Sequence, residues 1–321
     1  MDRIVHRALK SGALTACIIL SLAASAAGLM PHQAPGTTLL FGGDVMLGRS
    51  VAQHQTPGSW PQVLSNLEGY TRSADLFFVN LESPLTDSPQ VVEGMDLRAP
   101  PQSISALQAA GIDLVSLANN HAADAGQPGL AQSRQALVRA GILALEPEQE
   151  SLHITINGIR LAWLAYDDIL EPLDLVQAAA AVRRAQQDAD WVLVSIHWGS
   201  EGQATPNTRQ REIAATLAAA GADLIIGHHP HVLQPVEQLW GAGRGRPTLV
   251  AYNLGNLLFD QPAPPNRRAG LLRVQLDAFS LQGICLIPTV QSAVDGQPTI
   301  AEGAPAQWAL ARTQLTICAQ P

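Results

Sequence analysis

The segment Ala222–His231 reads ADLIIGHHPH, an apolar run followed by three histidines within four residues. The apolar run predicts a short buried strand, and the histidines stand where that strand ends. Histidine is the commonest protein ligand for transition metals, because its ring nitrogen is neutral near pH 7. In an extended segment His229 and His231 would point to the same side. We expect Gly227 to let the backbone turn sharply and Pro230 to fix φ between the two rings. The segment predicts a metal site rather than a histidine-rich surface loop.

Four other apolar runs also end in polar side chains. The five strand ends carry, in chain order, Asp44, Glu82, Asn120 with His121, His197, and His228 to His231. Helical segments, among them 129–140, 173–188 and 207–220, separate most of these runs. Short strands that alternate with helices are typical of a parallel sheet buried on both faces, and such sheets carry their sites beyond the carboxyl ends of the strands. The pattern therefore predicts an α/β fold with a metal site at one edge.

Two further pairs of strands are predicted to be antiparallel. Asn157-Gly158 separates apolar runs at 153–156 and 159–166, which is a strong signal for a β-hairpin. Runs at 271–277 and 284–290 predict a second antiparallel pair joined by a short turn. We therefore expect the protein to contain mixed pairing.

The first 26 residues are typical of a targeting segment. The basic residues Arg3, Arg7 and Lys10 precede an apolar run at 13–29, and Ala24-Ser25-Ala26 resembles a signal peptidase site. An uncleaved N-terminal membrane anchor is the alternative, although about 17 apolar residues is marginal for a membrane span. We expect an exported protein, periplasmic or on the outer face of the cell membrane.

Composition excludes several functional classes. The net charge of −8 over 321 residues argues against a nucleic-acid-binding surface. Lys10, within the targeting segment, is the only lysine, so Schiff-base, pyridoxal and P-loop chemistry are excluded from the mature chain. Beyond the targeting segment, Cys285 and Cys318 would form one disulfide in an oxidising compartment or remain two free thiols, and the sequence leaves both open.

Mixed histidine, carboxylate and amide ligands suit a divalent transition metal, namely Mn, Fe or Zn, bound as one or two ions. Two ions bridged by a carboxylate would activate water and neutralise a phosphate transition state. His121, beside Asn120, is the candidate catalytic residue that protonates a leaving oxygen. The alternative for His121 is a purely structural role.

Six ordered motifs carry a resemblance to a known family. They are Gly43-Asp44-Val45-Met46, Asn80-Leu81-Glu82, Asn119-Asn120-His121, His197-Trp198-Gly199 with Glu201, Gly227-His228-His229-Pro230-His231-Val232 with Gln234, and Leu254-Gly255-Asn256 with Phe259-Asp260. This series resembles the CapA family of capsule or poly-gamma-glutamate biosynthesis proteins, which have a calcineurin-like metallophosphoesterase fold. The resemblance covers 37–290, which we expect to be the domain, with 291–321 as a tail packed on it.

The resemblance implies a four-layer α/β/β/α sandwich with mixed sheets and the site at its strand ends. By position, Asp44, Glu82 and His231 would hold one metal ion. The second ion would be held by Glu82, Asn120, His197 and His229, with His121 as proton donor. Four further motif residues are candidates for substrate binding, namely Asn119, His228, Glu201 and Asn256.

Two positions depart from the wider phosphoesterase pattern. Met46 stands where that pattern has a histidine, and Glu82 stands where it has a bridging aspartate. The CapA group shares both features, which weaken the first metal site.

Two functions therefore stay open. One is a metal-dependent hydrolase or transferase that acts on an anionic envelope polymer or its precursor. The other is a non-catalytic binding or assembly subunit among membrane polymer-synthesis proteins.

Overall fold

The computed structural model describes residues 36–92, 94, 96–147, 149–241 and 245–320, within a folded unit at Ala34–Pro321. The predicted targeting segment at 1–26 lies outside the described residues. Within these ranges none of the helices has the length and hydrophobicity needed to cross a bilayer.

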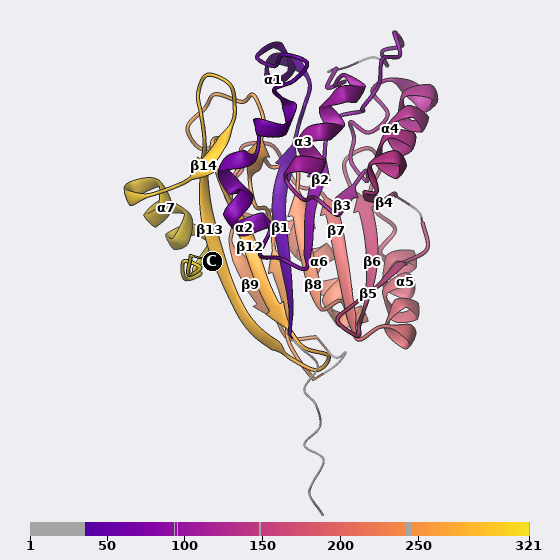
Figure 1. Ribbon diagram of the computed structural model, residues 1–321. Coiled ribbons are helices and arrows are strands. Elements are labelled where there is room, and N and C mark those ends of the chain that lie inside the picture. Colours follow the sequence, from indigo (N-terminus) through magenta and orange to yellow (C-terminus); the bar gives the residue numbers. More distant parts are fainter. Residues whose placement is uncertain (1–35, 93, 95, 148, 242–244, 321) are drawn as a thin grey trace, which may run out of the picture. The chain divides into compact units, whose positions relative to one another are not determined.

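The strands form two sheets (Figure 1). The first is eight-stranded and contains, in spatial order, β14 (Pro298–Ile300), β13 (Leu281–Gln291), β12 (Arg268–Leu276), β1 (Thr37–Val45), β2 (Leu76–Leu81), β3 (Leu114–Ser116) and β4 (Leu143–Leu145), with β11 (Asn256–Leu258) paired to β1. The second is six-stranded and contains β5 (Leu152–Ile156), β6 (Ile159–Asp167), β7 (Trp191–His197), β8 (Leu224–His228), β10 (Thr248–Ala251) and β9 (Val236–Leu239). Both sheets mix parallel and antiparallel pairs, as predicted.

Helices cover the outer faces of the sheets. On the first sheet lie α1 (Arg49–Gln53), η1 (Trp60–Gln62), η2 (Ser65–Leu67), α2 (Glu68–Thr71), η3 (Pro101–Ser103), α3 (Ile104–Ala109) and α4 (Gly126–Ala140). On the second lie α5 (Leu175–Asp188) and α6 (Thr208–Ala220). Helix α7 (Gly303–Thr313) packs against β12 and β13.

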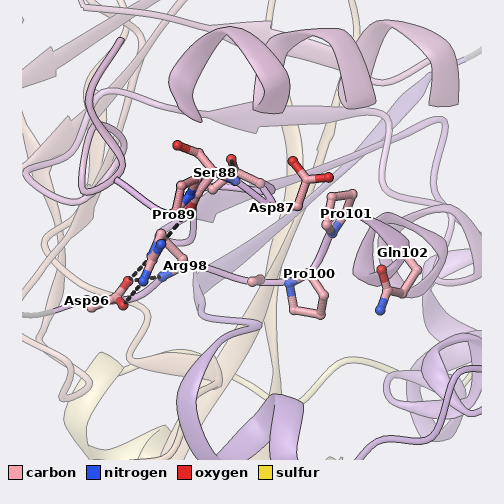
Figure 2. Close-up of a pocket in the computed structure, with 10 residues that line it drawn as sticks. Asp87, Ser88, Pro89, Asp96, Arg98, Pro100, Pro101 and Gln102 are labelled. Carbon is pink, nitrogen blue, oxygen red and sulfur yellow. Dashed lines mark hydrogen bonds and ion pairs between the residues drawn. The ribbon is translucent and has the colours of Figure 1, made fainter. Parts of the chain in front are cut away.

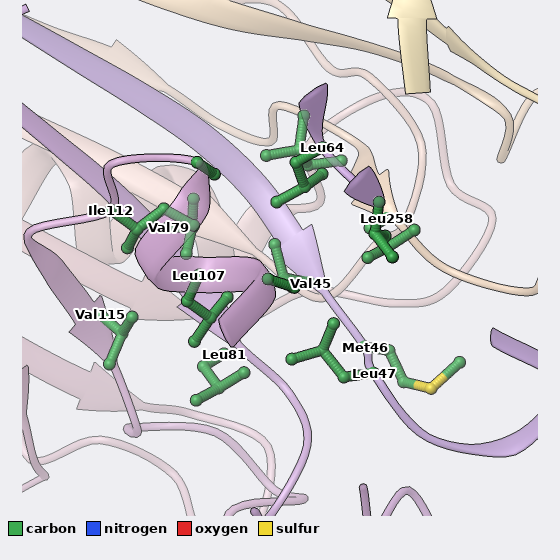
Figure 3. Packing of buried hydrophobic residues seen from close by; sticks show 14 of the residues in the cluster. Val45, Met46, Leu47, Leu64, Val79, Leu81, Leu107, Ile112, Val115 and Leu258 are labelled. Carbon is green, nitrogen blue, oxygen red and sulfur yellow. The ribbon is translucent and has the colours of Figure 1, made fainter. Parts of the chain in front are cut away.

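Three apolar cores hold these layers together, because alternate residues of each strand point to opposite faces. The core between the sheets includes Leu39, Phe41, Phe78, Trp163, Leu193 and Ile226. The core under α1 to α4 includes Leu40, Val79, Val115, Leu64 and Leu107, several of which are drawn in Figure 3. The core under α5 and α6 includes Leu164, Val192, Val194, Val182 and Leu217. Each such side chain contributes about 1.5–3 kcal/mol on burial, and the arrangement confirms the four-layer sandwich.

The five predicted strands that end in polar residues do not share one sheet. Those that precede Asp44, Glu82 and Asn120 are β1, β2 and β3 of the first sheet, whereas those that end in His197 and His228 are β7 and β8 of the second. The prediction of a single parallel sheet was therefore wrong. Local apolar runs predict strands, but they carry no information about which strands pair.

The predicted helix boundaries follow from local hydrogen bonding. In α6 the Asn207 side chain accepts from the N–H of Gln210, and the Gln210 side chain accepts from the N–H of Asn207, which forms a capping box. Gly221 and Gly141 end α6 and α4 in the left-handed conformation. These helices connect the parallel strands and so place the carboxyl ends of those strands at one edge of each sheet.

The histidine segment does not have the predicted backbone. Gly227 lies inside β8 with no left-handed φ, whereas His229 and His231 have φ values of 94° and 57°. The segment is therefore not extended beyond His228, and the expected role of Gly227 as the turning residue was wrong. Gly227 is required for a different reason, because a Cβ at this position would lie 2.1 Å from the carbonyl oxygen of Tyr252.

The C-terminal residues are joined to the first sheet. Strand β14 pairs with β13, and Cys285 on β13 forms a disulfide with Cys318 across a sequence separation of 33 residues. The backbone N–H of Cys318 also donates to Leu286 O at 2.9 Å. The disulfide resolves the alternative of two free thiols.

We expect replacement of Cys285 and Cys318 by serine to lower the free energy of unfolding by about 3–4 kcal/mol, because the cross-link restricts the unfolded chain. Denaturant titration measures the difference. The reductant dithiothreitol should lower the stability of the wild type to that of the variant and leave the variant unchanged. Equal stability of both proteins without reductant would contradict the prediction.

We expect Gly227→Ala to lower the stability by roughly 3 kcal/mol, the upper range for overpacking. The added methyl group would contact Tyr252 O and also lie 2.3 Å from Trp198 Nε1, which donates to that same oxygen. Gly58→Ala is the matched control, since no atom lies within 4 Å of the place its methyl group would take, and it should change stability by less than about 0.5 kcal/mol. Thermal unfolding of both variants measures the contrast.

Candidate metal centre

The predicted donor residues converge where the carboxyl edges of the two sheets meet. Asp44 lies near the end of β1 and Glu82 directly follows β2, while His197 and His228 end β7 and β8. Registers within the sheets align Asp44 with Asn80 and His197 with His228. Every side chain of the predicted metal set except Asn120, which is half-buried, is at most 8% exposed.

Asp44 contacts polar residues from both sheets. Its Oδ1 accepts from Asn80 Nδ2 at 2.9 Å and lies 3.3 Å from His228 Nδ1. Its Oδ2 accepts from the backbone N–H of His229 at 3.3 Å and lies 3.3 Å from His231 Nδ1. Burial alone would raise the pKa of Asp44, but hydrogen bonds and charge from His228 and His231 outweigh burial and hold this pKa well below its usual value.

Glu82 has the opposite environment. Both of its carboxylate oxygens are buried and accept no hydrogen bond among the described residues. Oε1 lies 3.7 Å from His197 Nε2 and 3.7 Å from His231 Nε2. Burial raises the pKa of Glu82 well above its usual value. A buried carboxylate that accepts no hydrogen bond costs several kcal/mol, so this geometry favours a cation beside Glu82.

The histidines around Glu82 differ in charge. Burial, with a contribution from His229, holds the pKa of His197 well below its usual value. Burial, with a contribution from His231, lowers the pKa of His229 to about 4. Burial also lowers the pKa of His231, but Glu82 and Asp44 outweigh it and raise the value to about 9. Two neutral imidazoles therefore face the centre, as metal binding requires.

The described residues contain two groups of donors in which the ligand atoms of each group all lie within 4.8 Å of one another, and both groups include Glu82. One contains Glu82, His229 and His231, and the other contains Asp44, Glu82 and His197. The resemblance also made Glu82 common to both ions, but it grouped Asp44 with His231 and His197 with His229. Asn120 Oδ1 is also buried and has no hydrogen-bond partner among the described residues.

Met46 provides no ligand to this centre. Its side chain is fully buried in the core under the helices, where Figure 3 shows it beside Leu47, and its Sδ accepts from the N–H of Gly48 at 3.0 Å. The position that carries a histidine in the wider phosphoesterase pattern is therefore part of the apolar core.

His121 is held by a carboxylate that the sequence analysis missed. Asp124 lies three residues later, and its Oδ2 is 3.0 Å from His121 Nδ1 while also accepting the N–H of Leu97 at 2.9 Å. An acceptor at Nδ1 places the proton on that nitrogen and leaves Nε2 available. The i, i+3 spacing of His121 and Asp124 was the available sequence signal.

Asn80 is a second residue that was missed as a functional side chain. Its Nδ2 donates to Asp44, and its Oδ1 accepts from Asn119 Nδ2 at 3.0 Å. Asn119 in turn accepts the N–H of His121 at 3.1 Å through its Oδ1. One amide network therefore connects the donor centre to His121.

The other predicted substrate-binding residues lie at different depths. The ring of His228 is buried and packs 5.8 Å from the Phe78 ring. Asn256 is buried, and its Oδ1 lies 2.8 Å from His231 Nδ1. Glu201 is exposed, and its charge still raises the pKa of Glu82. Of these three, only Glu201 reaches solvent.

Asp167 is a further carboxylate near the centre. It ends β6, aligns with His197 in register and is half-buried. Burial raises the pKa of Asp167, with an opposing effect from His121. The sequence analysis ended this strand at Tyr166 and therefore missed a polar strand end.

One cavity is separate from the donor centre. Its volume is about 510 Å³, and it is formed by the loop that follows Glu82, with none of the donor residues in its lining. Figure 2 shows Arg98 in this lining bound to Asp96 and to the backbone of Ser88. The loop is tied to Asp124 through Leu97, so the cavity and His121 share one support.

Comparison with known proteins gives related sequences over most of the chain. A PGA biosynthesis protein CapA from Bacillus subtilis (strain 168) is 30% identical over 259 residues, which cover 74% of this chain and 67% of that protein. A capsule biosynthesis protein CapA from Bacillus anthracis is 27% identical over 267 residues, which cover 74% of this chain and 64% of that protein. This chain thus spans about two thirds of the length of these relatives.

A solved structure described as a hypothetical protein from Thermus thermophilus has a TM-score of 0.49 at 19% identity and covers 78% of this chain and 98% of that chain. The model of the family described as bacterial capsule synthesis protein PGA_cap matches residues 38–261. This match contains all six motifs noted in the sequence and confirms the expected family. The chain belongs to the bacterial capsule synthesis protein family PGA_cap.

Proposed function

We propose that this protein is a metal-dependent hydrolase or transferase that acts outside the cytoplasm on an anionic envelope polymer of the capsular or poly-gamma-glutamate type, or on its precursor. The observation that carries the proposal is a set of buried polar atoms at the strand ends without hydrogen bonds among the described residues. The set contains both oxygens of Glu82, Oδ1 of Asn120, Nε2 of His197, both ring nitrogens of His228 and Nδ1 of His229. Buried polar atoms are almost always paired, so a cluster of unpaired ones favours a missing cation.

The donor chemistry fits a divalent transition metal, because imidazole and carboxylate suit Mn, Fe or Zn. Glu82 would be the central ligand, with His229, His231 and His197 around it. When bound, such an ion supplies Lewis-acid chemistry that polarises a carbonyl or phosphoryl oxygen and activates water.

The chain's own acid–base group is His121. Asp124 accepts at Nδ1 and thereby orients the ring, so in the imidazolium form Nε2 carries the proton that would go to the leaving group. Asn119 and Asn80 hold the backbone of His121 relative to Asp44. These residues thus position one acid beside the donor centre.

Separate observations support the proposed compartment and the proposed partners. A disulfide between Cys285 and Cys318 supports a location in an oxidising compartment. The relatives named for PGA and capsule biosynthesis support an envelope polymer as substrate and membrane polymer-synthesis proteins as partners.

A binding or assembly role is the second candidate. It is favoured by Met46, which stands in the apolar core where a phosphoesterase pattern has a metal ligand. In that role the metal would organise the pocket for binding, and the protein would turn over no substrate.

We expect Glu82→Gln to remove metal binding, because the amide lacks the negative charge that the ion requires. Elemental mass spectrometry of protein incubated with Mn²⁺, Fe²⁺ or Zn²⁺ and then desalted measures bound metal per chain. Glu201→Gln is the matched control, since it makes the same chemical change at an exposed carboxylate outside both donor groups, and it should retain full occupancy. Full occupancy in Glu82→Gln would rule out the proposed centre.

We expect His121→Ala to lower kcat by about 10²–10⁴-fold while metal content stays unchanged, since general acid catalysis contributes this much. Asp124→Asn should give a smaller loss, because the ring remains but its orientation is weakened. The assays use metal-loaded protein with a nitrophenyl phosphoester and with poly-gamma-glutamate, whose chain length is followed by light scattering.

The same assay separates the two candidate functions. Turnover by the wild type that depends on metal and falls in His121→Ala supports the enzyme. If wild type and His121→Ala bind the polymer equally and neither turns it over, the result favours the binding or assembly role.

A further inference from the structure

The two buried carboxylates of the centre, Asp44 and Glu82, differ in how many hydrogen bonds they accept from the protein. An ionised carboxylate offers about four lone-pair positions. Asp44 accepts one hydrogen bond at each oxygen, from Asn80 Nδ2 at 2.9 Å and from the backbone N–H of His229 at 3.3 Å, and its oxygens also lie 3.3 Å from His228 Nδ1 and His231 Nδ1. Glu82 accepts no hydrogen bond at either oxygen among the described residues. Both oxygens of Asp44 are therefore already engaged by the protein, whereas neither oxygen of Glu82 accepts a hydrogen bond.

The orientation of His231 depends on Asp44. Its Nδ1 lies 3.3 Å from Asp44 Oδ2 and 2.8 Å from Asn256 Oδ1. Asn256 Nδ2 donates to Gln261 Oε1 at 3.1 Å, which fixes the direction of the Asn256 amide. Two acceptors at Nδ1 hold a proton on that nitrogen, so Nε2, which faces Glu82 Oε1 at 3.7 Å, is the ring nitrogen that would release its proton and bind an ion.

This separation fits two ligands of one ion. Ligands about 2.1 Å from a tetrahedral centre lie roughly 3.4 Å apart, so small movements of Glu82 and His231 would bring both onto one ion. His229 completes the same donor group, and its Nδ1 is buried without a partner. Three protein ligands with one open position are typical of a catalytic site.

The second donor group lacks comparable ligands. It contains Asp44, whose oxygens are already engaged, besides Glu82 and His197. Met46, on the strand end that carries Asp44, points into the apolar core and provides no replacement. The second group is thus left with Glu82, which the first group already uses, and His197.

We propose that the centre binds a single ion through Glu82, His229 and His231, and that Asp44 is a positioning residue that orients His231 instead of binding the metal. This inference rests on the proposed metal function and assigns roles within the same site. It differs from the ligand set implied by the resemblance, which placed Asp44 on the first of two ions.

The test is calorimetric titration of the metal-free full chain with Zn²⁺, together with the visible absorption spectrum after loading with Co²⁺. We expect one ion per chain in the wild type and no binding by Glu82→Gln. Asp44→Asn should still bind one ion, about 10–100-fold more weakly, as is typical for residues that support a ligand. Its Co²⁺ bands should keep their positions, because no atom bound to the ion has changed.

Asn256→Ala is the matched variant, since it removes the other acceptor at His231 Nδ1. It should weaken binding by a similar factor with one ion retained. This variant decides the role of the Nδ1 partners if circular dichroism shows that Asp44→Asn is unfolded.

Two ions per chain in the wild type, or a shift of the Co²⁺ bands in Asp44→Asn, would overturn this inference and leave the proposed metal function intact. No bound ion in the wild type would overturn both. The inference is supported if the wild type and Asn256→Ala each bind one ion and the Co²⁺ bands of Asp44→Asn keep their positions.

Discussion

The buried charge of Asp44 is the constraint on which the site depends. Burying a carboxylate costs several kcal/mol of hydration free energy, unless protein groups replace the contacts that the carboxylate made with water. Asn80, on the first sheet, donates a hydrogen bond to Asp44. His228 and His231, from the strand end of the second sheet, place ring nitrogens 3.3 Å from its oxygens. Because these partners come from both sheets, the carboxylate can be satisfied only when the two carboxyl edges lie side by side. The same requirement brings Glu82 and the histidines within reach of one ion.

The backbone of the histidine segment depends on this charge as well. Non-glycine residues in the left-handed region cost about 1–3 kcal/mol each and persist only where the surroundings fix them. His229 and His231 are such residues, and the N–H of His229 donates to Asp44 while the N–H of Gly202 donates to Pro230 O at 2.9 Å. The strain therefore serves the site, since an extended segment would carry both rings away from Glu82.

The sequence was sufficient to predict the strands, the main helices and most of the polar residues that lie together at the strand ends, because apolar runs and capping residues act locally. It also indicated the four-layer fold, but through the resemblance and not through periodicity. Pairing of β7 with β8 in a second sheet is a long-range property, so the single-sheet prediction failed. The support of His121 by Asp124 and of Asp44 by Asn80 depends on side-chain direction, which spacing alone does not fix.

Glu82 is the residue whose presence needs a functional explanation. Replacing buried ion-paired groups with apolar side chains is often neutral or stabilising, so stability alone would not retain this carboxylate. Asp44 can be explained by its four contacts, but Glu82 has no hydrogen bond among the described residues and stands between the Nε2 atoms of His197 and His231. Its raised pKa expresses the same unfavourable burial. A cation at Glu82 would supply the contacts that this carboxylate lacks. Binding of the ion would therefore stabilise the fold and provide the chemistry of the site at the same residue.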